Sequence, residues 1–203
     1  MSLFQGESIH GVLQRSLMSA VRAIEQVGLT ALSDPALAGR IEKLWASHRP
    51  DVPVIFPDQR TGERREDRVA RNDYGQRVLV PITYVDVQVP YKGDASLFKV
   101  MPSRSPTIDE RIMADAGRLS FSLNLDEASK EQIDKLLAKI EANLQQMRID
   151  VGHYGKSALE QLARAAADRK YKLAAYAEDE EAGPLSDEQR TGALVELTSA
   201  LEY

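Results

Sequence analysis

The sequence predicts an α+β protein, and three stretches carry this prediction. Along residues 126–154, apolar side chains recur in strict four-three spacing between polar ones, which predicts a long helix with one narrow apolar face. Residues 78–89 are rich in β-branched side chains and predict a strand. Apolar residues at intervals of three and four near the N-terminus predict another amphipathic helix. We expect an N-terminal helical hairpin, a small and mainly antiparallel sheet, and the long amphipathic helix and a following helix packed on that sheet.

The narrow apolar face of the long helix needs a surface to pack on, because an isolated amphipathic helix gains most of its stability by burying that face. The surface is either the rest of this chain or a second copy, and both alternatives stay open. We call this set of residues the apolar seam: Ile133, Leu137, Ile140, Leu144, Met147, Val151 and Tyr154.

Composition limits the class of protein. The chain has 203 residues, of which 43% are hydrophobic and 28% charged, as in ordinary globular proteins. A formal net charge of -5 argues against attraction of the whole surface to nucleic acid or anionic lipid. The absence of cysteine excludes disulfides, thiolate catalysis and cysteine-ligated metals. Because no stretch reads as a membrane span and the N-terminus lacks an export signal, we expect a cytoplasmic protein.

The N-terminal part predicts two helices and an edge strand. The first helix spans residues 8–27 and stops at Gly28. Ser33 is the expected cap of the second helix, which ends near His48. Residues 51–56 favour a short strand at the edge of a sheet, because the segment contains a proline that cannot donate to a strand on that side.

The segment of residues 57–77 alternates arginines with acidic side chains and has almost no large apolar residue. A solvated loop or polar ribbon is the favoured interpretation, and a nucleic-acid surface is the alternative. In the following strand, the apolar residues change from even to odd positions near Tyr84, which predicts a bulge there. A turn at residues 92–94 and a returning strand at residues 97–101 would then form a hairpin.

Residues 118–125 alternate between apolar and polar side chains, which predicts a half-buried strand leading into the long helix. That helix is expected to start at Asp126 or Ser129, because both are good caps. Gly152 and Gly155 are expected to bracket its end.

The remaining residues predict how the chain is divided. A capping pattern starts a further helix over residues 157–173. Residues 1–174 are expected to form one domain, followed by an acidic linker at residues 175–185. A short C-terminal helix is expected over residues 186–203, with leucines spaced along one face.

No stretch carries a complete catalytic motif. The Gly-Lys-Ser sequence at residues 155–157 resembles the end of a phosphate-binding loop, but Asp150 stands where that loop needs its first glycine. The three histidines lie far apart in sequence and form no ligand pair. The acid-x-Lys triplet at residues 168–170 matches part of the motif of metal-dependent nucleases, but it falls on a predicted helix. We therefore expect no enzymatic activity, no metal and no cofactor.

A longer pattern runs through about half of the chain. Its parts are ITYVDVQVPYKGDASLF at residues 82–98, Met-Pro-Ser at residues 101–103, and MRIDV at residues 147–151. This pattern resembles the region that precedes restriction-endonuclease-like and Toll/interleukin-receptor-like effector domains in bacterial proteins of phage defence. The resemblance implies a non-catalytic module that positions, restrains or assembles an effector. Where the effector would follow, this chain has the predicted linker and short helix.

The leading hypothesis is therefore a regulatory or assembly module of a defence-type effector system, with the apolar seam as its main structural surface and residues 91–98 as a contact site. Its partner would be a protein or an effector domain, and a homodimer through the seam stays open. A small-molecule sensor remains a further hypothesis. The alternative is a nucleic-acid-binding protein that uses the arginines of the polar segment. These are Arg60, Arg64, Arg65, Arg68 and Arg71.

Overall fold

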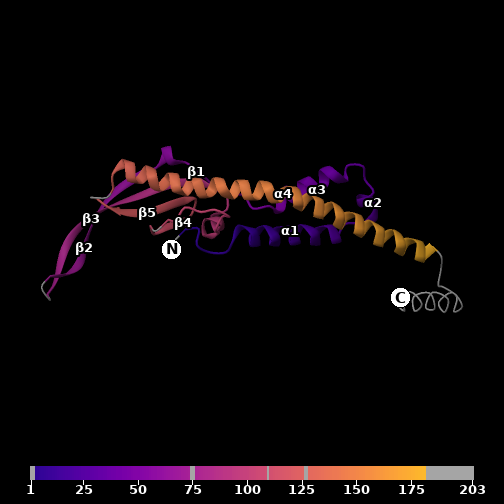
Figure 1. Ribbon diagram of the computed structural model, residues 1–203, viewed down its shortest axis with the longest axis horizontal. Helices are drawn as coiled ribbons and strands as arrows, with labels where there is room; N and C mark the ends of the chain where they lie inside the picture. Colours follow the sequence, from indigo (N-terminus) through magenta and orange to yellow (C-terminus); the bar gives the residue numbers. More distant parts are fainter. Residues whose placement is uncertain (1–2, 74–75, 109, 126–127, 182–203) are drawn as a thin grey trace.

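The structure is a computed structural model that describes residues 3–73, 76–108, 110–125 and 128–181. Helices and strands together confirm the predicted α+β class (Figure 1). In order, the elements of the described part are α1 (Ile9–Glu25), α2 (Leu29–Leu32), α3 (Leu37–His48), β1 (Val54–Ile55), the 3-10 turn η1 (Pro57–Gln59), β2 (Thr61–Asp73), β3 (Gln76–Lys92), the 3-10 turn η2 (Ala95–Lys99), β4 (Ile112–Asp115), β5 (Arg118–Asn124) and α4 (Lys130–Glu181).

The N-terminal helices form the predicted hairpin. α1 starts after Ser8, whose side chain accepts a hydrogen bond from the backbone N–H of Gly11 and caps the helix. α3 ends at His48, as expected from the proline that follows shortly after. The predicted cap of this helix is wrong, because Ser33 instead ends the additional helical turn α2. The start of α3 is held by Asp34, whose carboxylate accepts a hydrogen bond from a backbone N–H at 2.8 Å.

The sheet is antiparallel in every ladder of the described residues. Five strands contribute, in the order β1-β3-β5-β4, with β2 also paired to β3. Along the edge of β3 that faces away from β5, β2 pairs with residues 76–88 and β1 pairs with Tyr91 and Lys92. β1 is therefore the short edge strand that the sequence predicted.

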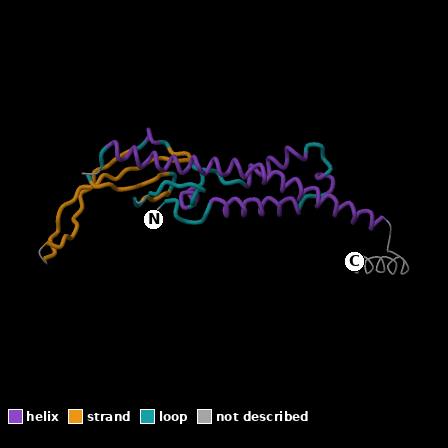
Figure 2. The backbone as a smooth tube through the Cα atoms, viewed as in Figure 1, coloured by secondary structure: helices purple, strands orange, loops and turns teal. Residues whose placement is uncertain are grey.

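The pairing of β2 with β3 is continuous, so the bulge predicted near Tyr84 is wrong. From Val85 onward, the odd positions of β3 face the core. The apolar residues at even positions before Val85 lie on the opposite face of a two-stranded ribbon that projects from the sheet (Figures 1 and 2). The change of pattern therefore marks the point at which the strand leaves the core, not a change of register.

α4 is longer than the sequence predicted. It starts after Ser129, whose Oγ accepts a hydrogen bond from the backbone N–H of Gln132 at 3.2 Å. It then runs for 52 residues through both glycines without a break, which is about 78 Å at the usual rise per residue. The predicted second helix over residues 157–173 is therefore the C-terminal half of α4, and residues 175–181 are helical as well. The short helix predicted over residues 186–203 lies outside the described residues.

α4 joins two parts of an elongated molecule. Its N-terminal half lies along the sheet, and its C-terminal half packs beside α1, α2 and α3 (Figures 1 and 2). One hydrophobic core includes residues from both parts. The last turns of α4 extend past α2 (Figure 1). None of the described helices combines the length and the apolar composition that crossing a membrane requires.

Candidate interaction surfaces

The predicted interaction residues of the apolar seam lie in the core of this chain. Its five central side chains are buried, and the two at its ends are half-buried against the core. Buried Ala158, Leu162 and Ala166 continue the seam beyond its predicted end. All these residues belong to one cluster with residues of α1, α3 and the sheet. The chain itself therefore supplies the surface on which the seam packs.

A buried amide holds the loop before β4 onto α4. Asn143 is fully buried, and its Nδ2 donates to the carbonyl oxygen of Pro106 at 3.2 Å while its Oδ1 accepts from the hydroxyl of Ser105 at 2.6 Å. Further along α4, the carboxylate of Asp150 accepts from the backbone N–H and the hydroxyl of Ser103 at 2.9 and 2.6 Å. Because Ser103 and Asp150 both belong to the pattern that resembles the defence proteins, part of that pattern has a structural role here.

The turn after β3 is shaped by a glycine. Gly93 has a φ of 113°, and a Cβ at this position would lie 2.9 Å from the Cα of Pro53. Asp94 then caps η2 with its side chain. The returning strand predicted at residues 97–101 is wrong, because η2 occupies most of this segment.

The predicted contact site at residues 91–98 is largely internal. Tyr91 and Phe98 are buried and pack edge to face, with 4.9 Å between the ring centroids. Leu97 is buried beside them in the same core cluster. This segment therefore stabilises the sheet end of the molecule and leaves little apolar surface for a partner.

Two of the five predicted nucleic-acid-binding arginines are engaged within the chain. Arg60 pairs with Asp134 of α4 at 2.7 Å. Arg65 pairs with Asp86 at 2.9 Å, and its guanidinium lies 5.3 Å from the centre of the Tyr84 ring. The first contact anchors the residue just before β2 to α4, and the second anchors β2 to β3.

Asp86 links three strands. It accepts hydrogen bonds from the hydroxyl of Ser122 on β5 and from Arg65 on β2. These bonds, with that from Ser122 contributing most, hold the pKa of Asp86 below its ordinary value. The hydrogen bonds that Arg65 donates to Asp86 and to Asp67 raise the pKa of Arg65. The carboxylate therefore ties the base of the ribbon to the rest of the sheet.

The other arginines are divided between the two faces of β2. Arg64 and Arg68 lie on the face opposite Arg65, since side chains alternate along a strand. Neither forms an ion pair within the described residues. Arg71 occupies the position of β2 paired with Val78. Arg60, Arg64, Arg65 and Arg68 therefore do not gather on one basic surface.

Three exposed apolar residues of the sheet lie on the projecting ribbon. We call residues 66–73 and 76–83 the arm, because β5 pairs with β3 only from residue 84 onward. Val69 is 37% exposed, Val78 is 44% exposed and Leu79 is 61% exposed. Neither outer edge of the arm has a strand partner in the part of the chain that the structure describes. Val69 and Val78 share one face of the arm, and Leu79 lies on the other. Sequence reasoning missed these exposed side chains, although the apolar run at even positions of the strand was the signal for Val78.

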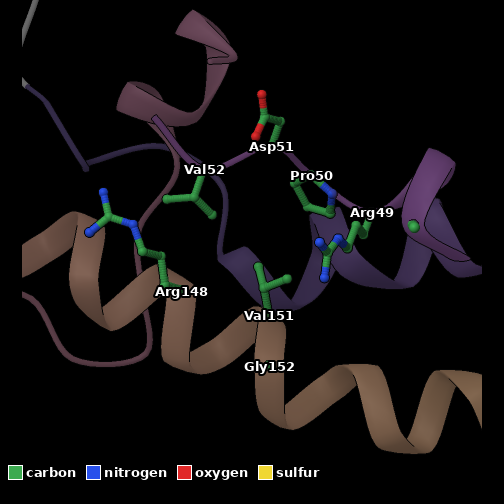
Figure 3. Close-up of a pocket in the computed structure, with 8 residues that line it drawn as sticks. Arg49, Pro50, Asp51, Val52, Arg148, Val151 and Gly152 are labelled. Atoms are coloured by element: carbon green, nitrogen blue, oxygen red, sulfur yellow. The ribbon is translucent and has the colours of Figure 1, made fainter. Parts of the chain in front are cut away.

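An open pocket of about 370 Å³ lies between the end of α3, the approach to β1, and α4 (Figure 3). Arg148 at its side donates to the carbonyl oxygen of Pro53 and to Glu141, at 2.7 Å in each case. Asp51 points its carboxylate away from α4 (Figure 3). Arg148 therefore serves to hold the approach to β1 against α4. Within the described ranges, no group of three or more His, Asp or Glu side chains is placed to hold a metal.

Comparison with protein-family models, curated proteins and solved structures finds no match for this chain. The resemblance to the regions that precede defence effectors therefore rests on the residues of the sequence pattern alone.

Proposed function

We propose that the chain is an assembly or regulatory module that acts through protein–protein contacts, with the arm as its contact surface. The observation that carries the proposal is the exposure of Val69, Val78 and Leu79 on a ribbon with two open edges. A two-stranded ribbon without further packing is marginally stable in water, and open strand edges are templates for pairing with another chain. A protein partner would both order the arm and cover its apolar side chains.

The charge of the arm and its base favours a protein partner over nucleic acid. Residues 61–83 contain five arginines and four acidic residues, so the ribbon is nearly neutral. Binding to a phosphate backbone needs an excess of positive charge along the contact. Arg65 is also held by Asp86 and is not free to reach a phosphate in this arrangement.

The partner we propose is an effector of the bacterial defence type. This narrower part of the proposal is supported by the resemblance carried by residues 82–98 and 101–103. In this arrangement the arm would engage the effector, while η2 and the loop held by Asn143 would keep the sheet end rigid.

One observation favours nucleic acid as a second candidate. Arg64 and Arg68 share a face of β2 and form no ion pair with any described residue. If they contact phosphates, binding of a duplex should weaken steeply as salt is raised and should weaken further in the chain carrying Arg64→Ala and Arg68→Ala. Binding that is absent, or that does not depend on salt, removes this candidate.

The experiment that tests the protein-contact proposal is a tagged pull-down from the native cell extract after nuclease treatment. The chain carrying Val69→Asp and Val78→Asp should lose a stoichiometric partner that the unchanged chain retains, because two carboxylates would be placed in the contact. Met113→Asp is the matched control, since Met113 is 64% exposed on β4 at the other side of the sheet. Equal retention by all three chains, or a partner that nuclease treatment removes, would contradict the proposal.

A further inference from the structure

β2 is paired along one edge. Its 13 residues pair with β3, and within the described residues no strand lies on its other edge. The N–H and C=O groups of such an edge can pair with a strand of another chain. Charged residues on an open edge usually prevent this pairing, because like charges then meet. The order of the charges along β2 therefore decides what can pair there.

Two copies of one strand can form a symmetric antiparallel pair only in certain registers. The two-fold axis is perpendicular to the sheet, so it keeps each side chain on its own face. Residues directly opposite each other share a face, and faces alternate along a strand. One residue must therefore lie on the axis, opposite the same residue of the copy.

Like charges exclude all but one of these registers along residues 65–71. A centre at residues 65–68 or at Arg71 would place a charged residue opposite itself. A centre at Ala70 would place two aspartates, at positions 67 and 73, opposite each other. Like charges directly opposite are destabilising. A centre at Val69 places no like charges opposite each other over residues 65–73.

The register centred on Val69 also brings opposite charges together. It places Asp67 opposite Arg71 of the copy and Arg65 opposite Asp73 of the copy, and the two-fold axis repeats each pair. Within one chain, Arg65 already pairs with Asp67 at 3.0 Å. Charges of opposite sign would therefore alternate both along each strand and across the dimer.

The centre of this register is apolar. Val69 lies opposite the half-buried Val80 of β3 in its own chain, and it is exposed. In the symmetric pair, the two copies of Val69 would be neighbours, so a row of four valines would cross four strands. Pairing would therefore remove an exposed apolar side chain of each copy from water.

We propose that a second copy of this chain pairs with the outer edge of β2, antiparallel and centred on Val69. The inference rests on the proposed function, in which the arm is the contact surface, and it names one partner of that surface. Because only residues 65–73 of each copy pair, the interface is small, as in transient complexes. We expect the dimer at high protein concentration and a monomer with both edges of the arm open after dilution. An effector that uses the same edge would replace the second copy.

Charge reversal in the purified full chain tests this register. Asp67→Arg and Arg71→Asp each place like charges opposite each other, so each should weaken dimerisation at least about tenfold. An equal mixture of the two variants should dimerise as well as the unchanged chain, because each aspartate at these positions again faces an arginine. Sedimentation velocity over about a hundredfold range of concentration measures the dissociation constants. Circular dichroism checks that each variant is folded.

A cysteine at the centre of the register is an independent test, because the natural chain contains none. Val69→Cys should form a disulfide between two copies under mild oxidation, since residues directly opposite in an antiparallel pair have a suitable separation. Leu79→Cys is the matched control, because Leu79 is exposed on the arm but belongs to β3. The control should form no such disulfide at the same protein concentration.

A purified chain that is monomeric at every concentration would overturn the inference. A partner retained in the pull-down would then still support the proposed function, so the two failures are distinguishable. A dimer that charge reversal does not weaken, or that the mixture of variants does not restore, would overturn the inference too. So would a Val69→Cys cross-link that is absent or no stronger than that of Leu79→Cys.

Discussion

Trp45 and Gly155 are in direct contact, since a Cβ on Gly155 would lie 3.3 Å from the indole Nε1 of Trp45. Trp45 is buried on α3, and its ring centroid lies 6.2 Å from that of Tyr154. The glycine therefore lets α3 approach α4 where a larger residue would hold it away. Three residues earlier, a Cβ on Gly152 would meet no atom within 4 Å. The two glycines of α4 thus have different roles.

This difference predicts that the two glycines respond differently to substitution by alanine. Gly152→Ala should increase the free energy of unfolding by about 0.5–1 kcal/mol, because alanine favours helix and nothing obstructs the added methyl group. Gly155→Ala should gain less or lose stability, because the indole of Trp45 must move. Urea denaturation followed by the fluorescence of Trp45, the single tryptophan, measures both changes. Equal stabilisation by the two substitutions would show that the contact is not tight.

The buried amide of Asn143 should contribute strongly to stability. Asn143→Leu removes its bonds to Ser105 and Pro106 and leaves these loop groups without that partner, at a cost of about 1–3 kcal/mol. Gln161→Leu is the control, because the exposed Gln161 bonds only to the neighbouring Ser157 in the described part of the chain. A loss of stability no greater than that of the control would contradict the role of Asn143 in holding the loop.

A charge in the apolar seam should unfold the chain. Leu144 has no exposed surface, so Leu144→Asp would bury a carboxylate without a partner. Ile149→Asp provides a comparison on the same helix, since Ile149 is 41% exposed and should tolerate the change. Circular dichroism and size-exclusion chromatography distinguish the outcomes. A folded Leu144→Asp monomer obtained from a dimeric parent would mean that the seam is an interface between copies.

Asp86 should make stability depend on pH in a defined direction. The pKa of Asp86 is lowered in the folded chain. The carboxylate therefore stabilises the fold at pH values above its unfolded pKa of about 4. This contribution disappears as the pH falls through the folded pKa. Asp86→Asn should therefore lower the free energy of unfolding near neutral pH. It should also reduce the loss of stability that occurs when the pH falls from about 7 to about 3. An unchanged profile for Asp86→Asn would exclude this role.

The spacing of apolar residues along the sequence predicted the helices and strands that bury one regular face. The four-three spacing of the seam led to residues that are buried in the core, and the alternation around Leu119 and Phe121 led to β5. The end of α4 could not be predicted in this way. Glycines usually end helices, but here Trp45 packs on Gly155 and tertiary contacts keep the helix continuous.

The candidate site was predicted less well than the fold. The arginines were visible in the sequence, but their division between two faces and the pairing of Arg65 with Asp86 depend on the register of β2. Val69 fell in the predicted polar segment and Val78 on the predicted strand, and the change from even to odd positions near Tyr84 was interpreted as a bulge, not as the point at which the strand leaves the core. The partner of the seam was left open by the sequence, and it is supplied by α1, α3 and the sheet.

Hydrogen–deuterium exchange on the complex retained in the pull-down tests the central claim that the arm is the contact surface. The outer-edge amides of residues 66–73 and 76–83 should exchange at least about tenfold more slowly in the complex than in the free chain, because a partner would pair with or cover them. Slower exchange confined to other parts of the molecule, with the arm unchanged, would contradict the claim.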